Sequence, residues 1–230
     1  IALYAMIATG EEKKETVIFL HGIPGNERNL DLAQDLRRAN YNTIFFSYRG
    51  AWGSQGEYLY SHCLEDVGHI LDYLSDSVIA NELRVDTDRF TLIGHSLGGG
   101  VALIAGSKDS RVNKIIALSS FNISNNLQEG DTKDSLDGLR NYLKSSFMLN
   151  AVFDNFAQEL LDHKDEFNVV SHKEALAKKK VLVLDDFDRM EKWPGQISEV
   201  VKYTVIESDH SFTNKRVELS RYILNWIDSN

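Results

Sequence analysis

The chain has 230 residues, with 25 lysines and arginines against 34 aspartates and glutamates, so its formal net charge at pH 7 is −9. This length fits one α/β domain with a large core, and the negative charge argues against nucleic acid or an anionic membrane surface as a partner. Cys63 is the only cysteine, which excludes an intrachain disulfide and a C-x-x-C metal or redox site.

The printed sequence contains neither a membrane-span pattern nor a signal-peptide pattern. No apolar run approaches the length of a membrane span, and no charged segment precedes an apolar stretch as in a signal peptide. With a single cysteine, the chain fits a reducing compartment, so we expect a cytoplasmic protein. The sequence begins at Ile1, and a leader removed before this residue stays an open alternative.

The first part of the chain alternates strand and helix patterns. Residues 1–8 are apolar and lead through a polar turn to the apolar run 17–20, which predicts an edge hairpin feeding a buried strand. Leu32 and Leu36 are four residues apart and predict a helix, and residues 43–46 predict a second buried strand. This β-α-β order is typical of a parallel sheet.

The alternation continues to the C-terminus. Further buried strands are predicted at residues 90–93, 114–118, 181–184 and 203–206. Helical stripes of apolar residues are found at 64–74, 101–105 and 219–227. The whole pattern predicts a single α/β domain over residues 1–230 with a mostly parallel, doubly wound sheet.

Residues 121–179 interrupt this pattern, because they contain no convincing buried strand. A polar loop comes first, and two amphipathic helical faces follow it. The first face is formed by Leu136, Leu139, Tyr142 and Leu143, and the second by Phe153, Phe156, Ala157, Leu160 and Leu161. We expect a helical lid inserted in the domain, whose many acidic residues form either a solvated face or an acidic cover over a site.

The segment 90–100 carries the strongest functional signal. An apolar strand runs directly into Gly94-His95-Ser96-Leu97-Gly98, and a helical run follows. This is the G-x-S-x-G pattern of a nucleophile elbow, in which the strained turn requires small residues two before and two after the serine. Ser96 is therefore the predicted nucleophile, next to the N-terminus of a helix.

A second loop supplies candidates for an oxyanion hole. His21-Gly22-Ile23-Pro24-Gly25 follows a buried strand, at the sheet edge where α/β proteins place their sites. Pro24 has no N–H, so Ile23 is the predicted donor of this loop, and the N–H of Leu97 is the predicted second donor. His21 is expected to brace the loop.

Acyl transfer by a serine also needs a base and a carboxylate. His210 follows the last predicted strand on a short loop before the final helix, which favours it as the base. Three aspartates follow the strand at 181–184, namely Asp185, Asp186 and Asp188. A carboxylate several residues beyond the strand can reach the histidine, which favours Asp188, and Asp186 stays the main alternative.

Two residues are weaker candidates for a substrate pocket. Trp52 follows the strand at 43–46 and could form an apolar wall, although its segment could instead brace the oxyanion loop. His95 lies next to the nucleophile in the sequence.

These motifs carry a resemblance to a known family. The stretches VIFLHGIPGNERNLDLA from Val17, SYRGAWGSQG from Ser47, RFTLIGHSLGG from Arg89 and DHSF from Asp209 resemble α/β-hydrolases. Within that superfamily the chain is similar to bacterial prolyl-oligopeptidase-like and dienelactone-hydrolase-like esterases. The resemblance implies an α/β-hydrolase fold, with Ser96 as nucleophile, Asp188 as acid, His210 as base, and Ile23 and Leu97 as oxyanion donors.

Two departures from the family concern the acid. The interval between Asp188 and His210 is shorter than usual, and residues 190–194 replace the usual apolar segment that ends in proline. The sequence predicts a cofactor-free serine hydrolase of the carboxylesterase type without a metal, acting on a small ester or thioester. A peptidase that cleaves acyl-peptides or oligopeptides, and a catalytically silent hydrolase fold used for binding, are the alternatives.

Overall fold

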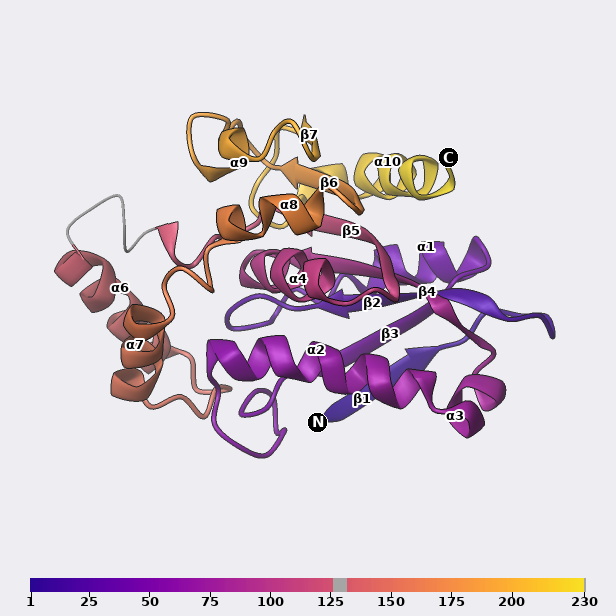
Figure 1. Ribbon diagram of the computed structural model, residues 1–230, viewed down its shortest axis with the longest axis horizontal. Coiled ribbons are helices and arrows are strands. Elements are labelled where there is room, and N and C mark those ends of the chain that lie inside the picture. Colours follow the sequence, from indigo (N-terminus) through magenta and orange to yellow (C-terminus); the bar gives the residue numbers. More distant parts are fainter. Residues whose placement is uncertain (126–131, 230) are drawn as a thin grey trace.

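The computed structural model describes residues 1–125 and 132–229 (Figure 1). Its centre is a seven-stranded sheet in the order β1-β3-β2-β4-β5-β6-β7. β1 pairs antiparallel with β3, and every other neighbouring pair is parallel. The strands are β1 (Ala2–Met6), β2 (Lys14–Leu20), β3 (Asn42–Ser47), β4 (Val85–His95), β5 (Val112–Leu118), β6 (Lys180–Asp185) and β7 (Lys202–Val205).

Helices connect these strands and cover both faces of the sheet. They are α1 (Leu30–Arg38), α2 (Tyr60–Ser75), α3 (Ser77–Glu82), α4 (Leu97–Lys108), α6 (Thr132–Ser145), α7 (Phe153–Asp162), α8 (Lys173–Leu176), α9 (Trp193–Gln196) and α10 (Arg216–Asp228), with 3-10 turns η1 (Val169–His172) and η2 (Thr213–Lys215). In the two described ranges, none of these helices is long and apolar enough to cross a membrane.

The continuous apolar strands have two buried faces, as expected for a parallel sheet. On β2, Val17 and Phe19 pack in a core with side chains of α1 and α10, whereas Ile18 and Leu20 pack in a second core with side chains of α2 and α4. Figure 1 shows α1 and α10 next to each other and apart from α2. The doubly wound sheet predicted from the sequence is therefore confirmed.

The predicted N-terminal hairpin is wrong. β1 pairs with β3, and β2 lies between β3 and β4. A strand has two hydrogen-bonding edges, and parallel neighbours occupy both edges of β2, so none is left for β1. The turn after β1 is held at the start of β3 instead, because the Ala8 N–H donates to Asn42 Oδ1 at 3.1 Å.

The strand order places a crevice beside β2. The chain passes from β2 to β3 on one side and then crosses to β4 on the other side. Loops that leave the carboxyl ends of β2 and β4 therefore diverge, and this is the position where open α/β sheets bind ligands. The candidate residues Ile23 and Ser96 follow these two strands.

The predicted helical insertion lies between β5 and β6. Helices α6 and α7 carry the two amphipathic faces expected from the sequence, and Figure 1 shows them to the left of the sheet. The polar loop expected before them includes residues 126–131, which lie outside the described residues. After α6, Leu149 forms an isolated bridge with Ala51, which ties this segment to the loop after β3.

Glu159 of α7 attaches the insertion to α2. Its carboxylate accepts hydrogen bonds from the backbone N–H of Tyr60 at 2.5 Å and from the Ser61 N–H and hydroxyl. Leu59, the residue before α2, provides no side-chain cap. The carboxylate of α7 therefore satisfies N–H groups at the positive end of α2.

We predict that Glu159→Ala lowers the free energy of unfolding by about 1–2 kcal/mol, the usual cost of losing an N-terminal cap. Urea denaturation followed by circular dichroism measures this change. Asp162→Ala is the matched control, because Asp162 is an exposed carboxylate of the same helix that accepts from Gln158. The control should change stability by less than about 0.5 kcal/mol, and equal effects of the two variants would contradict the capping role.

Candidate active site

Ser96 lies between the last residue of β4 and the first residue of α4. Its backbone has φ 56° and ψ −122°, a conformation that a residue with a side chain rarely adopts. Its carbonyl accepts from the N–H groups of Gly99 at 2.9 Å and Phe121 at 3.0 Å, and its N–H donates to Leu118 O. These bonds hold the strained turn, and the side chain is half-buried at its tip.

The glycines beside Ser96 have no room for a side chain. A Cβ on Gly94 would lie 2.0 Å from the carbonyl oxygen of Gly98, and a Cβ on Gly98 would lie 2.3 Å from that of Leu20. The strand, the helix and the end of β2 therefore approach one another by backbone contact. This geometry is that of the nucleophile elbow expected from the sequence.

The loop after β2 passes directly beside the serine. A Cβ on Gly22 would lie 2.9 Å from Ser96 Cβ. Ile23, the next residue, lines one cavity together with Ser96 and Leu97. Leu97 is the first residue of α4, so its N–H has no acceptor within the helix. The structure thus brings both predicted oxyanion donors to the side of Ser96.

His21 braces this loop, as the sequence analysis expects. The side chain is buried, and burial lowers its pKa to about 4, so the imidazole is neutral at pH 7. Its Nδ1 lies 2.8 Å from Gly22 O, and a carbonyl can only accept, so the proton is on Nδ1. In a trans peptide the C=O and N–H groups point in opposite directions. Holding Gly22 O therefore turns the N–H of Ile23 away from the His21 ring.

His210 lies on the loop between β7 and η2, and its side chain is exposed. The buried His95 fixes this loop against the elbow, because His95 Nε2 lies 2.8 Å from His210 O and the two rings are 4.8 Å apart. Desolvation lowers the pKa of the His210 imidazole, and the nearby charge of Arg189 also lowers it. The carboxylates of Asp186 and Asp209 raise this pKa, but the net value lies below the ordinary one.

His95 links Ser96 to His210, because it precedes Ser96 in the sequence and its Nε2 contacts His210 O. Among the hydrogen bonds of the described residues, none joins Ser96 Oγ to the imidazole of His210. Such bonds are often long in ligand-free sites and shorten when substrate binds.

The three candidate acids have different surroundings. Asp185 and Asp186 are buried at the end of β6, and the Arg189 guanidinium contacts both, with Nη1 2.8 Å from Asp185 Oδ1 and Nη2 2.7 Å from Asp186 Oδ1. Burial raises the pKa of Asp185 to about 6. Burial also acts to raise the pKa of Asp186, but Ser119 and Arg189 outweigh it and hold that pKa below its usual value.

Asp188, the acid favoured by the sequence, is exposed. Its Oδ1 accepts from the Met190 N–H at 2.9 Å and from the Tyr203 hydroxyl at 3.5 Å. Asp186 acts on the pKa of His210, and Asp188 is not among the charges that do so. These contacts favour the alternative, Asp186. Sequence reasoning missed Arg189, which only its contact with two buried carboxylates identifies.

The cavity beside Ser96 has a volume of about 390 Å³. Its lining is mostly apolar and comes from the oxyanion loop, the elbow, the segment after β5 and helix α6. The lining residues are Ile23, Ser96, Leu97, Phe121, Ile123, Asp134, Ser135, Gly138, Leu139 and Tyr142. Trp52 and His95 are not part of this described lining. Trp52 instead donates from Nε1 to Pro24 O at 2.6 Å, and His95 contacts His210 O. Both residues therefore contact loops of the candidate site.

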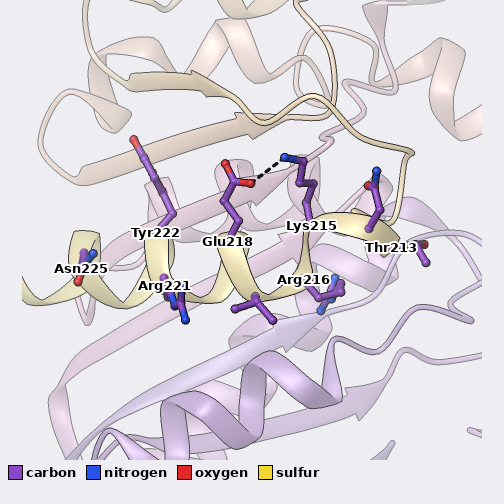
Figure 2. A pocket seen from close by; sticks show the side chains of 9 residues that line it. Thr213, Lys215, Arg216, Glu218, Arg221, Tyr222 and Asn225 are labelled. Carbon is purple, nitrogen blue, oxygen red and sulfur yellow. Dashed lines mark hydrogen bonds and ion pairs between the residues drawn. The ribbon is translucent and has the colours of Figure 1, made fainter.

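A larger recess of about 760 Å³ lies along η2 and α10 (Figure 2). It is open, most of its lining residues are polar or charged, and Figure 2 shows its Lys215 and Glu218 paired with each other. None of the predicted site residues lines it. Within residues 1–125 and 132–229, no cluster of three or more histidine, cysteine or acidic side chains is placed to hold a metal ion.

Comparison with known proteins agrees with this fold. The family described as the alpha/beta hydrolase fold matches residues 15–216. The chain belongs to this family. An uncharacterized 31.7 kDa protein from the traX-finO intergenic region of Escherichia coli is 30% identical to this α/β-hydrolase over 141 residues, which are 59% of this chain and 47% of that protein. The match therefore spans about half the length of that relative.

Solved structures show the same fold at low sequence identity. The esterase Est1E from Butyrivibrio proteoclasticus, with ferulic acid bound, has a TM-score of 0.71 and 14% identity, covering 98% of this α/β-hydrolase and 93% of that chain. The 2,6-dihydroxy-pseudo-oxynicotine hydrolase has a TM-score of 0.67 and 15% identity, and the match covers 98% of this chain and 64% of that hydrolase. An esterase from Pyrococcus furiosus has a TM-score of 0.64 and 17% identity, and the match covers 94% of this chain and 82% of that esterase.

We predict that Gly98→Ala lowers the free energy of unfolding by about 3 kcal/mol or more, because the new Cβ meets a backbone oxygen that cannot move aside. Gly68→Ala is the matched control. Gly68 lies within α2, and a Cβ there meets no atom within 4 Å, so this change should stabilise by about 0.5–1 kcal/mol. Urea unfolding measures both, and wild-type stability of Gly98→Ala would contradict the backbone contact.

Proposed function

We propose that this α/β-hydrolase is a serine hydrolase of the carboxylesterase type, which cleaves a small ester or thioester through an acyl-enzyme on Ser96. The observation that carries the proposal is the strained turn at Ser96, which lines one cavity together with Ile23 and Leu97. A strained backbone that the surrounding structure maintains is characteristic of functional sites. Esterases among the solved structures of this fold support the same reaction class.

In the proposed first step, Ser96 Oγ attacks the carbonyl carbon of the ester and transfers its proton to the imidazole of His210. The carbonyl oxygen becomes an oxyanion, which accepts hydrogen bonds from the N–H groups of Ile23 and Leu97. The bond from the carbonyl carbon to the leaving oxygen of an ester, or to the leaving sulfur of a thioester, then breaks. The His210 imidazolium returns the proton to the departing alcohol or thiol.

The second step reverses these roles with water. His210 removes a proton from water, the hydroxide attacks the acyl carbon, and the same two N–H groups bind the oxyanion. Ser96 leaves with the proton from His210, and the free acid departs. Serine, imidazole, carboxylate and two backbone N–H groups are sufficient for both steps, so the reaction requires no cofactor.

The base must be neutral to accept the serine proton. Desolvation holds the pKa of His210 below its ordinary value, which keeps the imidazole neutral at pH 7. An ionised carboxylate near the ring then stabilises the imidazolium as it forms. We assign this role to Asp186, which is buried, ionised and acts on His210, in place of the sequence prediction Asp188.

The cavity size favours a small acyl group. A volume of about 390 Å³ is near the lower end of the roughly 300–1,000 Å³ typical of small-molecule sites. The apolar lining fits the acyl chain of an ester or thioester better than a polar peptide. Peptidase activity and a catalytically silent binding role are outcomes that the following experiment distinguishes.

We predict that a fluorophosphonate probe labels the wild-type protein at one serine and that Ser96→Ala abolishes labelling, because the probe reacts with an activated serine hydroxyl. Mass spectrometry identifies the labelled peptide. Ser120→Ala is the control, since Ser120 is another buried serine near the start of α4, and it should keep the label. An unlabelled wild type would indicate the silent alternative, and turnover of peptides but not of short-chain esters would indicate the peptidase.

The acid is tested by two isosteric variants. We predict that Asp186→Asn lowers kcat by about 10⁴-fold, the scale seen when a triad carboxylate is neutralised, and that Asp188→Asn stays within about tenfold of wild type. Steady-state hydrolysis of a short-chain ester measures both. If Asp188→Asn loses far more kcat than Asp186→Asn, Asp188 is the carboxylate that acts on His210.

A further inference from the structure

Three consecutive carbonyl groups of the oxyanion loop accept hydrogen bonds from side chains. Gly22 O accepts from His21 Nδ1 at 2.8 Å, and Pro24 O accepts from Trp52 Nε1 at 2.6 Å. Between them, Ile23 O accepts from the hydroxyl of Tyr142 at 2.8 Å. His21 belongs to the loop itself, whereas Tyr142 is in helix α6 of the insertion, 119 residues away in sequence.

The two donors that come from outside the loop, Tyr142 and Trp52, are connected to each other. Ser145 and Ser146 both donate from their hydroxyls to Tyr142 O and hold the end of α6. A few residues later, Met148 O accepts from the Trp52 N–H at 2.9 Å. The contacts therefore form a closed ring that runs from Ile23 to Tyr142, along the chain to Met148, across to Trp52 and back to Pro24.

This ring restricts the residue whose N–H is the proposed oxyanion donor. Ile23 is the proposed oxyanion donor, and its own carbonyl is the group that Tyr142 holds. With Gly22 O fixed on one side and Ile23 O on the other, rotation about both backbone bonds of Ile23 is limited. An oxyanion donor is effective only when it is already oriented before charge develops.

We propose that Tyr142 is a positioning residue for catalysis, through which helix α6 holds the N–H of Ile23 toward the oxyanion. This inference rests on the proposed function. The insertion then has two roles, because the Tyr142 ring also lines the cavity beside Ser96. Burial raises the pKa of the Tyr142 hydroxyl, so it stays protonated and can donate throughout the neutral range.

The two roles of Tyr142 make different kinetic predictions. The oxyanion is common to all ester substrates, so loss of positioning should lower kcat by the same factor for an acetyl and a butyryl ester. A wall of the pocket contacts only the longer acyl chain, so loss of a wall should change KM and affect the butyryl ester alone.

The test is Tyr142→Phe, which keeps the ring and removes the hydroxyl. We expect kcat to fall about fivefold to tenfold on 4-nitrophenyl acetate and butyrate alike, with KM nearly unchanged, as for the loss of one hydrogen bond. Trp52→Phe removes the donor on the other side of the loop and should act in the same way. Leu139→Ala, which shortens the cavity wall on the same helix, should instead raise KM for the butyrate ester.

Tyr222→Phe is the matched control, since this tyrosine hydrogen-bonds to Thr204, away from Ser96, and it should retain wild-type kcat. Wild-type kcat in Tyr142→Phe, or a loss confined to the butyrate ester, would overturn the positioning role. If Ser96 of the wild type is labelled by fluorophosphonate, such a result leaves the proposed hydrolase function intact. If the wild type is neither labelled nor active on these esters, both proposals are overturned.

Discussion

Contact between three backbone segments at Ser96 is the constraint on which the rest of this structure depends. The end of β2, the end of β4 and the first turn of α4 approach so closely that a methyl group on Gly94 or Gly98 would collide with a carbonyl oxygen. This approach holds Ser96 in a strained conformation and brings the loop after β2 beside it. Ile23 and Leu97 then line one cavity together with Ser96.

Buried charge at the end of β6 is balanced in a way that suits an acid and base pair. Two adjacent buried carboxylates repel each other, and each loses hydration. The guanidinium of Arg189 contacts both and offsets this cost. Ser119 and Arg189 together hold the pKa of Asp186 below its usual value, whereas burial raises the pKa of Asp185 even though Arg189 acts to lower it. The two neighbouring carboxylates therefore titrate in different ranges.

The insertion between β5 and β6 is joined to the catalytic side of the sheet at several points. Glu159 caps α2, Leu149 pairs with Ala51, and Tyr142 holds the oxyanion loop. Helix α6 also supplies one wall of the cavity. The same helix therefore lines the cavity and holds the backbone of Ile23. The remaining domain provides Ser96, and the insertion completes the cavity beside it.

The sequence by itself determined the strands, the main helices and the elbow, because their signals are local. Continuous apolar runs require a parallel sheet with two covered faces, and glycines around a serine require a tight strand-to-helix turn. It also indicated His210 and the loop containing Ile23 from their places after predicted strands.

Only the tertiary structure decided features that depend on long-range contacts. β1 joined β3 because both edges of β2 were occupied. Asp186 is favoured over Asp188 because it is buried and acts on the pKa of His210, and this burial depends on the segments that fold around the end of β6. Tyr142 reached Ile23 across 119 residues, and no periodicity or spacing encodes such a contact, since a hydrogen bond depends on where folding places its two atoms.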